Sequence, residues 1–305
     1  MFQVSVSPHV RDKATTQGIM FGVIVALLPA VIVALLIFKL PAFVVVGTSI
    51  FTAIFTEAVI NYLRKKPLTI FDGSALLTGL LLAMTLPPTT PWWAAALGAF
   101  VAIAIAKQAF GGLGMNIFNP ALVGRAFLLA SYPVILTTWV KPFSGITTAS
   151  PLGIAKEAGP QAALAATSYI DSFLGVIPGS LGETSALALL IGGIFLLAFK
   201  IIDWRIPLSY IATVAVMAFL FKQDIPFHLL NGGLMIGAFF MATDYVTSPV
   251  TPWGRVVFGM GAGLITMVIR LWGGYPEGVC YSILLMNAVT PLLDKLRFQK
   301  DAYIS

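Results

Sequence analysis

Charged side chains, cysteine and histidine are all scarce in this chain of 305 residues. Asp, Glu, Lys and Arg make up 10% of the residues, against roughly 25% in soluble domains. So few charges cannot cover the apolar surface of a folded chain, which indicates that lipid is its solvent. The one cysteine, Cys280, excludes an internal disulfide and an iron–sulfur cluster held by this chain alone. The two histidines, His9 and His228, argue against a histidine-rich metal site.

Nucleotide-binding and export motifs are lacking as well. No Walker motif occurs, which argues against ATP driving the protein directly. The glycines of "GMGAG" (259–263) have no strand before them and lie in an apolar stretch, so they predict close helix packing. The start of the chain is polar and carries Arg11, Asp12 and Lys13, without a cleavage site after a short apolar core. We interpret it as a cytoplasmic tail rather than a cleaved signal.

Ten apolar stretches lie between polar residues, prolines and glycines. A helix needs about 20 apolar residues to cross the hydrocarbon core of a bilayer. The sequence therefore predicts an all-α integral membrane protein with about ten transmembrane helices, of which the third and the eighth are short. The predicted spans are 17–38, 42–62, 74–86, 92–109, 117–139, 185–201, 206–222, 227–243, 253–271 and 277–293.

The lysines and arginines predict the orientation of these spans. With the N-terminus inside and ten crossings, thirteen of the 18 lysines and arginines fall on the inner face and the other five on the outer face. The positive-inside rule therefore favours both termini in the cytoplasm and an outer loop over 140–184. The formal charge of +6 reflects this topology, and no nucleic-acid partner is expected.

Three short motifs recur in the same order in the two halves of the chain. Five spans in each half is an odd number, so the halves have to be inverted relative to each other. Such repeats are common in transporters, where sites lie at the repeat interface. We therefore expect a first membrane repeat (1–139), an outer loop (140–184) and a second membrane repeat (185–305). The motifs are "TPWW" (90–93) and "TPWG" (251–254), "GGLG" (111–114) and "GGYP" (273–276), and "MNIFNPAL" (115–122) and "MNAVTPLL" (286–293).

Proline-rich breaks end the third and the eighth span, at "MTLPPTTP" (84–91) and "TDYVTSPVTP" (243–252). Broken spans in matching positions point to a buried site, because protein or ligand has to satisfy the freed backbone groups. The alternative is a kink or re-entrant turn that serves packing alone.

Glu57 and Arg125 are ionisable residues within predicted spans. Glu57 and Arg125 are each about 10 Å from the inner surface, at 1.5 Å of rise per residue. Intramembrane charges usually pair with each other or line a cavity. The first hypothesis is therefore a structural ion pair between Glu57 and Arg125, and the alternative is that Glu57 belongs to a cation path. Asp244, at the end of the eighth span, is a second candidate for the ion path or a solvated interfacial carboxylate.

Two amides follow the glycines of "GGLG". Asn116 and Asn119 are three residues apart, so on a helix they lie on one face and can clamp a flat polar ligand. The alternative is that they cap the following helix, as asparagine often does.

Five stretches of the sequence resemble the RnfD and NqrB family of membrane subunits. RnfD belongs to the Rnf ion-translocating ferredoxin:NAD oxidoreductase complex, and NqrB to the sodium-pumping NADH:quinone oxidoreductase. The long N-terminal extension usual in NqrB is absent, so the resemblance to RnfD is the stronger. The stretches are "SPHVRDKATTQGIM" (7–20), "SALLTGLLLAMTLPP" (74–88), "AKQAFGGLGMNIFNPALVG" (106–124), "GAFFMATDYVTSP" (237–249) and "IRLWGGYPEGVCYSILLMNAVTPLLD" (269–294).

The resemblance implies an electron-carrying subunit of a redox-driven translocase in the bacterial cytoplasmic membrane. Electrons would pass from ferredoxin to NAD through this chain and the other Rnf subunits, coupled to movement of Na⁺ or H⁺. The alternatives are an NqrB-like subunit, a flavin-free channel or transporter of the inverted-repeat type, and an inert scaffold subunit.

The resemblance also implies two flavins. The family joins FMN through its phosphate to a threonine in a pattern like Ser/Thr-x-Ala-Thr-Pro-Leu, and "TTASPL" (147–152) occupies the matching place. Ser150 then stands at the attachment point, with Thr148 and Thr147 as alternatives in a shifted register, and absence of a covalent link as the third outcome. The family's second flavin is riboflavin, held without a covalent bond near the inner side. Asn116 and Asn119 are the residues implied to contact it.

Overall fold

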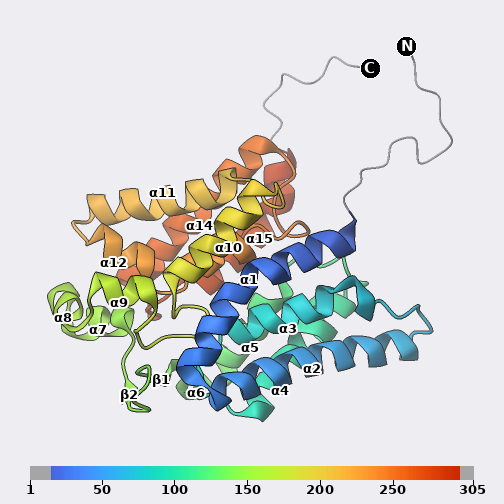
Figure 1. The fold of residues 1–305 in the computed structure, drawn as a ribbon. Helices are drawn as coiled ribbons and strands as arrows, with labels where there is room; N and C mark the ends of the chain where they lie inside the picture. Colours follow the sequence, from blue (N-terminus) through green and yellow to red (C-terminus); the bar gives the residue numbers. More distant parts are fainter. Residues whose placement is uncertain (1–14, 296–305) are drawn as a thin grey trace, which may run out of the picture.

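The computed structural model describes residues 15–295, and nearly all of its regular secondary structure over that range is helical (Figure 1). Within these residues the only strands are β1 (Trp139–Val140) and β2 (Thr147–Thr148), which pair antiparallel. The predicted tails, with Arg11, Lys13, Arg297 and Lys300, lie outside the described residues. The location of the two termini therefore stays a prediction.

The first half of the chain forms five main helices in the predicted places. Prolines mark several starts, since proline at the first helical position loses no hydrogen bond; Pro120 and Pro133 begin α5 and α6. The elements are α1 (Thr16–Phe38), α2 (Leu40–Leu63), η1 (Ile70–Asp72), α3 (Ser74–Met84), α4 (Trp92–Ile103) with its π-helical continuation η2 (Ala104–Gln108), α5 (Pro120–Ser131) and α6 (Pro133–Thr137).

The predicted outer loop contains the β1–β2 hairpin and three short helices. These are α7 (Pro151–Ala158), α8 (Pro160–Ala166) and α9 (Tyr169–Leu174). In Figure 1 they gather at the left end of the molecule, whereas α1 begins at the opposite end. The segment 140–184, predicted as a loop, therefore forms a small helical layer at one end of the bundle.

The second half repeats the order of the first, with a broken third member. The predicted span 227–243 is not one helix, because Gly232 and Gly233 have positive φ angles of 75° and 66° and interrupt it. The elements are α10 (Ala186–Ala198), α11 (Arg205–Leu220), α12 (Ile225–Leu230), α13 (Leu234–Ile236) with the π-helical η3 (Gly237–Met241), α14 (Pro252–Trp272) and α15 (Val279–Lys295).

Corresponding helices of the two halves end alike. A lysine with φ between 52° and 55° follows each of α1, α2, α10 and α11, namely Lys39, Lys65, Lys200 and Lys222. A cation at a helix C-terminus interacts favourably with the exposed carbonyls. The halves contact each other where α1 packs against α10 and α5 packs against α15.

Two of the three recurring motifs occupy equivalent positions. "TPW" begins both α4 and α14. The first glycine pair follows η2, the continuation of α4, and the second glycine pair follows α14. The third pair does not match in structure. Asn116 precedes α5, whereas Asn287 lies in the middle of α15. The third motif pair therefore does not support the predicted repeat.

Three helices, α1, α2 and α14, are long and apolar enough to cross a membrane, and α3, α4 with η2, α5, α10 and α11 are shorter apolar helices. This establishes a multi-pass membrane protein and leaves the number of ten crossings as a prediction. The 11 residues of α3 extend about 16 Å at 1.5 Å per residue, half the thickness of a bilayer core. Its end therefore lies inside the protein.

The glycines of "GMGAG" pack α14 closely against α11, as predicted. A Cβ atom on Gly263 would lie 2.7 Å from Thr213 Cβ and 2.9 Å from Tyr210 O, and one on Gly259 would overlap Ser209 Oγ. Small residues at these positions let the two backbones approach each other, which is how membrane helices gain packing energy.

Replacing Gly263 with alanine is expected to destabilise this helix pair. The added methyl group forces α11 away, at a cost of about 1–3 kcal/mol for overpacking. Gly47→Ala is the matched control, because no atom lies within 4 Å of its added Cβ and helix propensity favours alanine by about 1 kcal/mol. Thermal unfolding in detergent measures both. Equal midpoints for the two variants would contradict the close packing.

Candidate functional site

The two broken spans end inside the protein, where side chains and loops satisfy their carbonyl groups. At the end of α3, Met84 O accepts from Gly182 N at 2.6 Å and Leu86 O from Leu181 N at 3.0 Å. The guanidinium of Arg125 donates to Thr85 O. The predicted break at 84–91 is therefore held by the segment before α10 and by α5, which is what a buried non-helical backbone requires.

The second break is held in a similar way, by amides. Asn119 Nδ2 donates to Met241 O at 3.2 Å, where η3 ends. Asn287 Nδ2 and Thr290 Oγ1 donate to Thr247 O at 3.1 and 2.9 Å. Asn287 Oδ1 in turn accepts from Asn119 N at 3.1 Å. Buried amides of α5 and α15 thus join the two halves at the broken span.

A cavity opens between these two breaks, on the predicted inner side. It contains about 710 Å³ of empty space, counted to its open mouth, and is lined by residues of both halves. One wall is apolar and includes Phe239 and Phe240 of η3. The polar lining side chains are Ser74, Thr78, Lys107, Asn116, Asn119, Thr243, Asp244 and Tyr245. Both π-helical segments contribute, which agrees with the frequent place of such segments at functional sites.

The two predicted asparagines have different roles. Asn119 Oδ1 accepts from Ala121 N and Leu122 N at the start of α5, and its Nδ2 binds Met241 O. It is a helix cap and a link between the halves, so the capping alternative is confirmed for it. Asn116 is 6% exposed and donates to Phe118 O at 3.1 Å. Both residues line the cavity, and the side chain of Asn116 keeps a second N–H and its carbonyl oxygen for a ligand.

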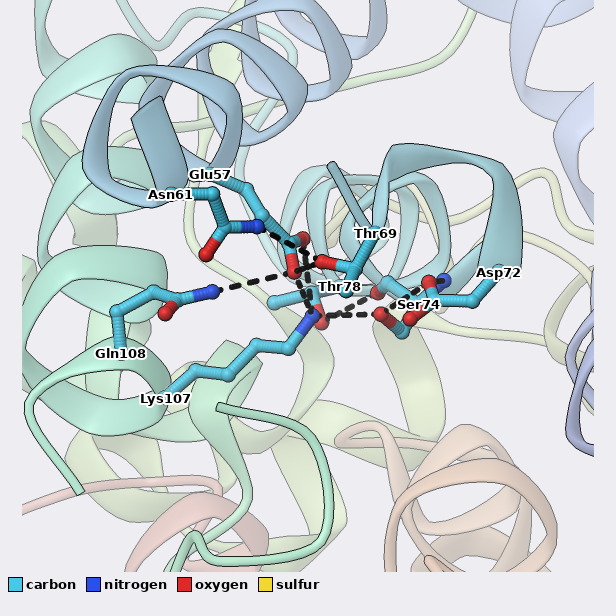
Figure 2. A network of polar contacts seen from close by, with 8 residues as sticks. All are labelled: Glu57, Asn61, Thr69, Asp72, Ser74, Thr78, Lys107 and Gln108. Carbon is cyan, nitrogen blue, oxygen red and sulfur yellow. Dashed lines mark hydrogen bonds and ion pairs between the residues drawn. The ribbon is translucent and has the colours of Figure 1, made fainter. Parts of the chain in front are cut away.

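Glu57 pairs with Lys107, and the predicted pair of Glu57 with Arg125 is wrong. Figure 2 shows Lys107 Nζ pointing at the carboxylate, 3.1 Å from Oε1 and 3.0 Å from Oε2. Both residues are 1% exposed. The pair forms because η2 carries Lys107 to the side of α2. Arg125 instead bonds Glu277 Oε2, so the first half is joined to the residues before α15.

Neutral donors complete the shell of Glu57 (Figure 2). Thr69 Oγ1 and Gln108 Nε2 donate to its Oε1 at 2.9 and 3.2 Å. Lys107 Nζ also donates to Ser74 Oγ at 2.6 Å. Ser74 Oγ donates to the carboxylate of Asp72, which caps α3. The buried pair is therefore well hydrogen-bonded, and Lys107 stands between Glu57 and the cavity that Asp244 lines.

The predicted attachment residues lie apart from this cavity, in the outer layer. Ser150 is 5% exposed, and its Oγ accepts from Gly153 N at 3.1 Å as the cap of α7. Thr147 and Thr148 are exposed on β2, opposite Val140 and Trp139. The first choice of attachment residue is thus the buried one, and both alternatives are accessible.

Three residues of the charge network were not predicted as site residues: Lys107, Glu183 and Glu277. Lys107 lies inside the predicted span 92–109, so an intramembrane charge was visible in the sequence, although it was counted only for topology. Glu183 lies in a segment between spans and Glu277 is the first residue of the tenth predicted span, so no local pattern distinguishes either from a solvated carboxylate.

Comparisons with known proteins agree with the resemblance. Residues 3–302 match the NQR2, RnfD, RnfE family. The chain is 51% identical over 300 residues, 98% of this chain and 93% of the relative, to a subunit of the Na⁺-translocating ferredoxin:NAD⁺ oxidoreductase complex of Acetobacterium woodii. It is 50% identical over 315 residues (97% and 94%) to a subunit of the proton-translocating ferredoxin:NAD⁺ oxidoreductase complex of Clostridium ljungdahlii. It is 38% identical over 338 residues (96% of each) to a subunit of the ion-translocating oxidoreductase complex of Escherichia coli. The chain therefore belongs to the NQR2, RnfD, RnfE family.

Proposed function

We propose that this chain is the flavin-carrying, electron-transferring membrane subunit of an ion-translocating ferredoxin:NAD⁺ oxidoreductase of the bacterial cytoplasmic membrane. The names of its relatives support membership of such a complex and imply its other subunits as partners, whereas the flavins are implied by the family resemblance. The names leave the ion open, because a sodium-translocating and a proton-translocating relative are equally similar to the chain. The observation that carries the proposal is the inner cavity.

The chemistry of the cavity lining suits the ring system of riboflavin. An isoalloxazine has an apolar benzenoid side and a polar pyrimidine side, and this cavity has an aromatic wall at Phe239 and Phe240 and a polar rim. Asn116 offers a donor and an acceptor to the polar side, as base-like edges require. Thr78 Oγ1 also lines the cavity, and because it donates to Ser74 O it offers a ligand an acceptor. When bound, a flavin supplies electron transfer that no side chain of this chain supplies.

FMN on Ser150 would fit the start of α7. A phosphate esterified to Ser150 Oγ would lie at the N-terminus of that helix, where Gly153 N now donates to the hydroxyl. Free amides and the helix dipole stabilise a phosphate in that position. Because the hydroxyl is buried, attachment has to precede closure of the outer layer over it. The exposed Thr148 and Thr147 are the alternative attachment residues.

The charges around the inner cavity supply a route to ion coupling. Lys107 lies between the cavity and Glu57, and Asp244 faces the cavity directly. Negative charge added inside the cavity attracts the ammonium of Lys107 away from Glu57, since electrostatic interactions are strong where water is excluded. Glu57 and Asp244 would then attract a cation, Na⁺ or H⁺, from the inner side.

The test separates the two flavins by their linkage. Acid precipitation of the purified complex is expected to release riboflavin from the inner cavity and to leave FMN on the peptide 142–156. Ser150→Ala should abolish the peptide-bound FMN, whereas Thr148→Ala and Thr147→Ala should retain it. Asn116→Ala should weaken riboflavin retention about tenfold, the equivalent of one hydrogen bond.

Met115→Ala is the matched control for Asn116→Ala, because Met115 is 67% exposed and does not line the cavity. FMN on one of the threonines would move the attachment point and keep the function. A colourless complex without either flavin would overturn the proposal and favour the channel or transporter hypothesis.

A further inference from the structure

A second cavity lies on the outer side of the same junction. It is bounded by the end of α3, the middle of α5, the break between α12 and α13, and the residues before α15. Its polar lining residues are Thr85, Arg125, Ser180, Glu183 and Glu277. The broken spans of the predicted inverted repeat meet here, and inverted-repeat folds hold transported ions at such places.

The segment before α10 carries Glu183 into this cavity. Its main chain is fixed to the broken end of α3 by the bonds of Leu181 and Gly182. Glu183 itself is 7% exposed. Glycines leave room for its carboxylate, because a Cβ atom on Gly179 would lie 2.8 Å from Oε2 and one on Gly233 would lie 3.0 Å from Oε1. The carboxylate is therefore held in a fitted, buried place.

The charged groups that face Glu183 have other partners. Arg125, from α5, bonds Glu277 and Thr85 O. Arg270, from α14, donates only to main-chain carbonyls of the described residues, namely His228 O, Asn231 O, Gly232 O and Glu277 O at 2.6 to 3.2 Å. Within residues 15–295 Glu183 forms no salt bridge, and Ser180 is its hydrogen-bonding neighbour. A buried carboxylate without a bonded counter-ion favours its protonated form.

A route to the outer surface begins at the same residues. Arg125, Glu277 and Cys280 also line a third cavity, which extends to Thr137, Trp139 and Tyr275 near the outer layer. The salt bridge of Arg125 with Glu277 thus forms the wall between the cavity of Glu183 and the outer side.

We propose that Glu183 is a proton-exchanging residue on the outer half of the ion path. Its carboxylate takes up one proton from cavity water to become a carboxylic acid and returns that proton to water on the outer side, with no other bond made or broken. This role rests on the proposed function, since the complex supplies the driving force. It places a titratable group beyond Glu57 and Asp244, on the far side of the buried amides that join the halves.

The surroundings of Glu183 poise this exchange near neutral pH. Glu183 lies between α9 and α10, outside the spans. Burial, and to a smaller extent the negative charge of the nearby Glu277, raise the pKa of Glu183 to about 8, whereas the positive charge of Arg125 lowers it. The carboxyl group therefore holds its proton below that pH and loses it as the pH rises through it.

Dicyclohexylcarbodiimide tests the proposal on the intact, unmodified complex, because it reacts with protonated carboxyl groups in apolar surroundings. Peptide mass spectrometry should find the N-acylurea adduct on Glu183 at about pH 6.5. At about pH 9.5 the labelling should be about thirtyfold lower, because the protonated fraction of a carboxyl group with a pKa midway between these two pH values falls by that factor. Glu157, exposed on α7, should stay unlabelled. An unlabelled Glu183, labelling that does not change with pH, or protection by Na⁺ at constant pH would each overturn the proposal.

Glu183→Gln supplies the second readout. Glutamine imitates the protonated form, so the variant should assemble, keep both flavins and lose ion transport about tenfold relative to electron transfer. Glu157→Gln should transport as the original complex does. Unchanged coupling in Glu183→Gln would overturn the proposal, whereas loss of the flavins from the original complex would overturn the proposed function instead.

Discussion

Replacing Lys107 with methionine is expected to destabilise the protein by about 3–5 kcal/mol, the usual cost of breaking a buried ion pair by removing one partner. The substitution removes three hydrogen bonds of Nζ, to both oxygens of Glu57 and to Ser74 Oγ. It leaves the carboxylate of Glu57 buried with only neutral donors. Thermal unfolding of the purified complex in detergent, with the midpoint of the transition as the readout, measures the effect.

A double variant distinguishes loss of the pair from loss of packing. Glu57→Gln combined with Lys107→Met removes both charges and keeps similar volumes, so most of the lost stability should return, because the uncompensated charge is the main cost. Lys141→Met is the control at an exposed lysine and should change the midpoint little. A double variant as unstable as Lys107→Met alone would show that the ion pair is not what stabilises this region.

Replacing Arg125 with glutamine should have an effect of similar size, about 3–5 kcal/mol. Its guanidinium bonds both Thr85 O and Glu277. Removing it leaves Thr85 O buried without this donor and the carboxylate of Glu277, 15% exposed, without its counter-ion. Arg125→Lys retains the charge, but a single ammonium cannot reproduce the planar, two-pronged geometry. We therefore expect lysine to restore less than half of the loss. The measurement is again the unfolding midpoint, together with the yield of assembled complex.

Arg205→Gln provides the matched control for Arg125. Arg205 also forms a salt bridge, with Asp203 at 2.8 Å, but its side chain is 34% exposed. Exposed pairs contribute about 0–1 kcal/mol, so this variant should unfold close to the original midpoint. Full recovery by Arg125→Lys would contradict the two-pronged role, and equal effects of the two glutamine variants would contradict the importance of burial.

The two charge clusters lie on opposite sides of the buried amides that join the two halves. The inner cluster, around Glu57 and Lys107, borders the inner cavity, and the outer cluster, around Arg125 and Glu183, borders the outer one. Asn119 and Asn287 join the two halves between them. In the proposed ion path a cation passes these amides, and there a change in the inner cavity would control its passage.

The sequence by itself determined the features that depend on local composition. Apolar length marked the helices, and proline marked the break after Met84, because lipid and backbone hydrogen bonding act on each segment separately. The small residues at 259–263 predicted close packing against another helix, and the structure identifies that helix as α11. Matching stretches along the whole chain indicated the family.

Only the tertiary structure decided which charged and amide groups meet. Glu57 and Lys107 are 50 residues apart, and Arg125 and Glu277 are 152 apart. Depth in the membrane suggested Glu57 with Arg125, but the π-helical turn of η2 brings a nearer cation to Glu57. Likewise the side-chain amide of Asn119 donates to Met241 O, and Glu183 is buried by a loop that no sequence periodicity predicts. Such contacts depend on how the two halves pack, and the order of residues along one span does not contain that information.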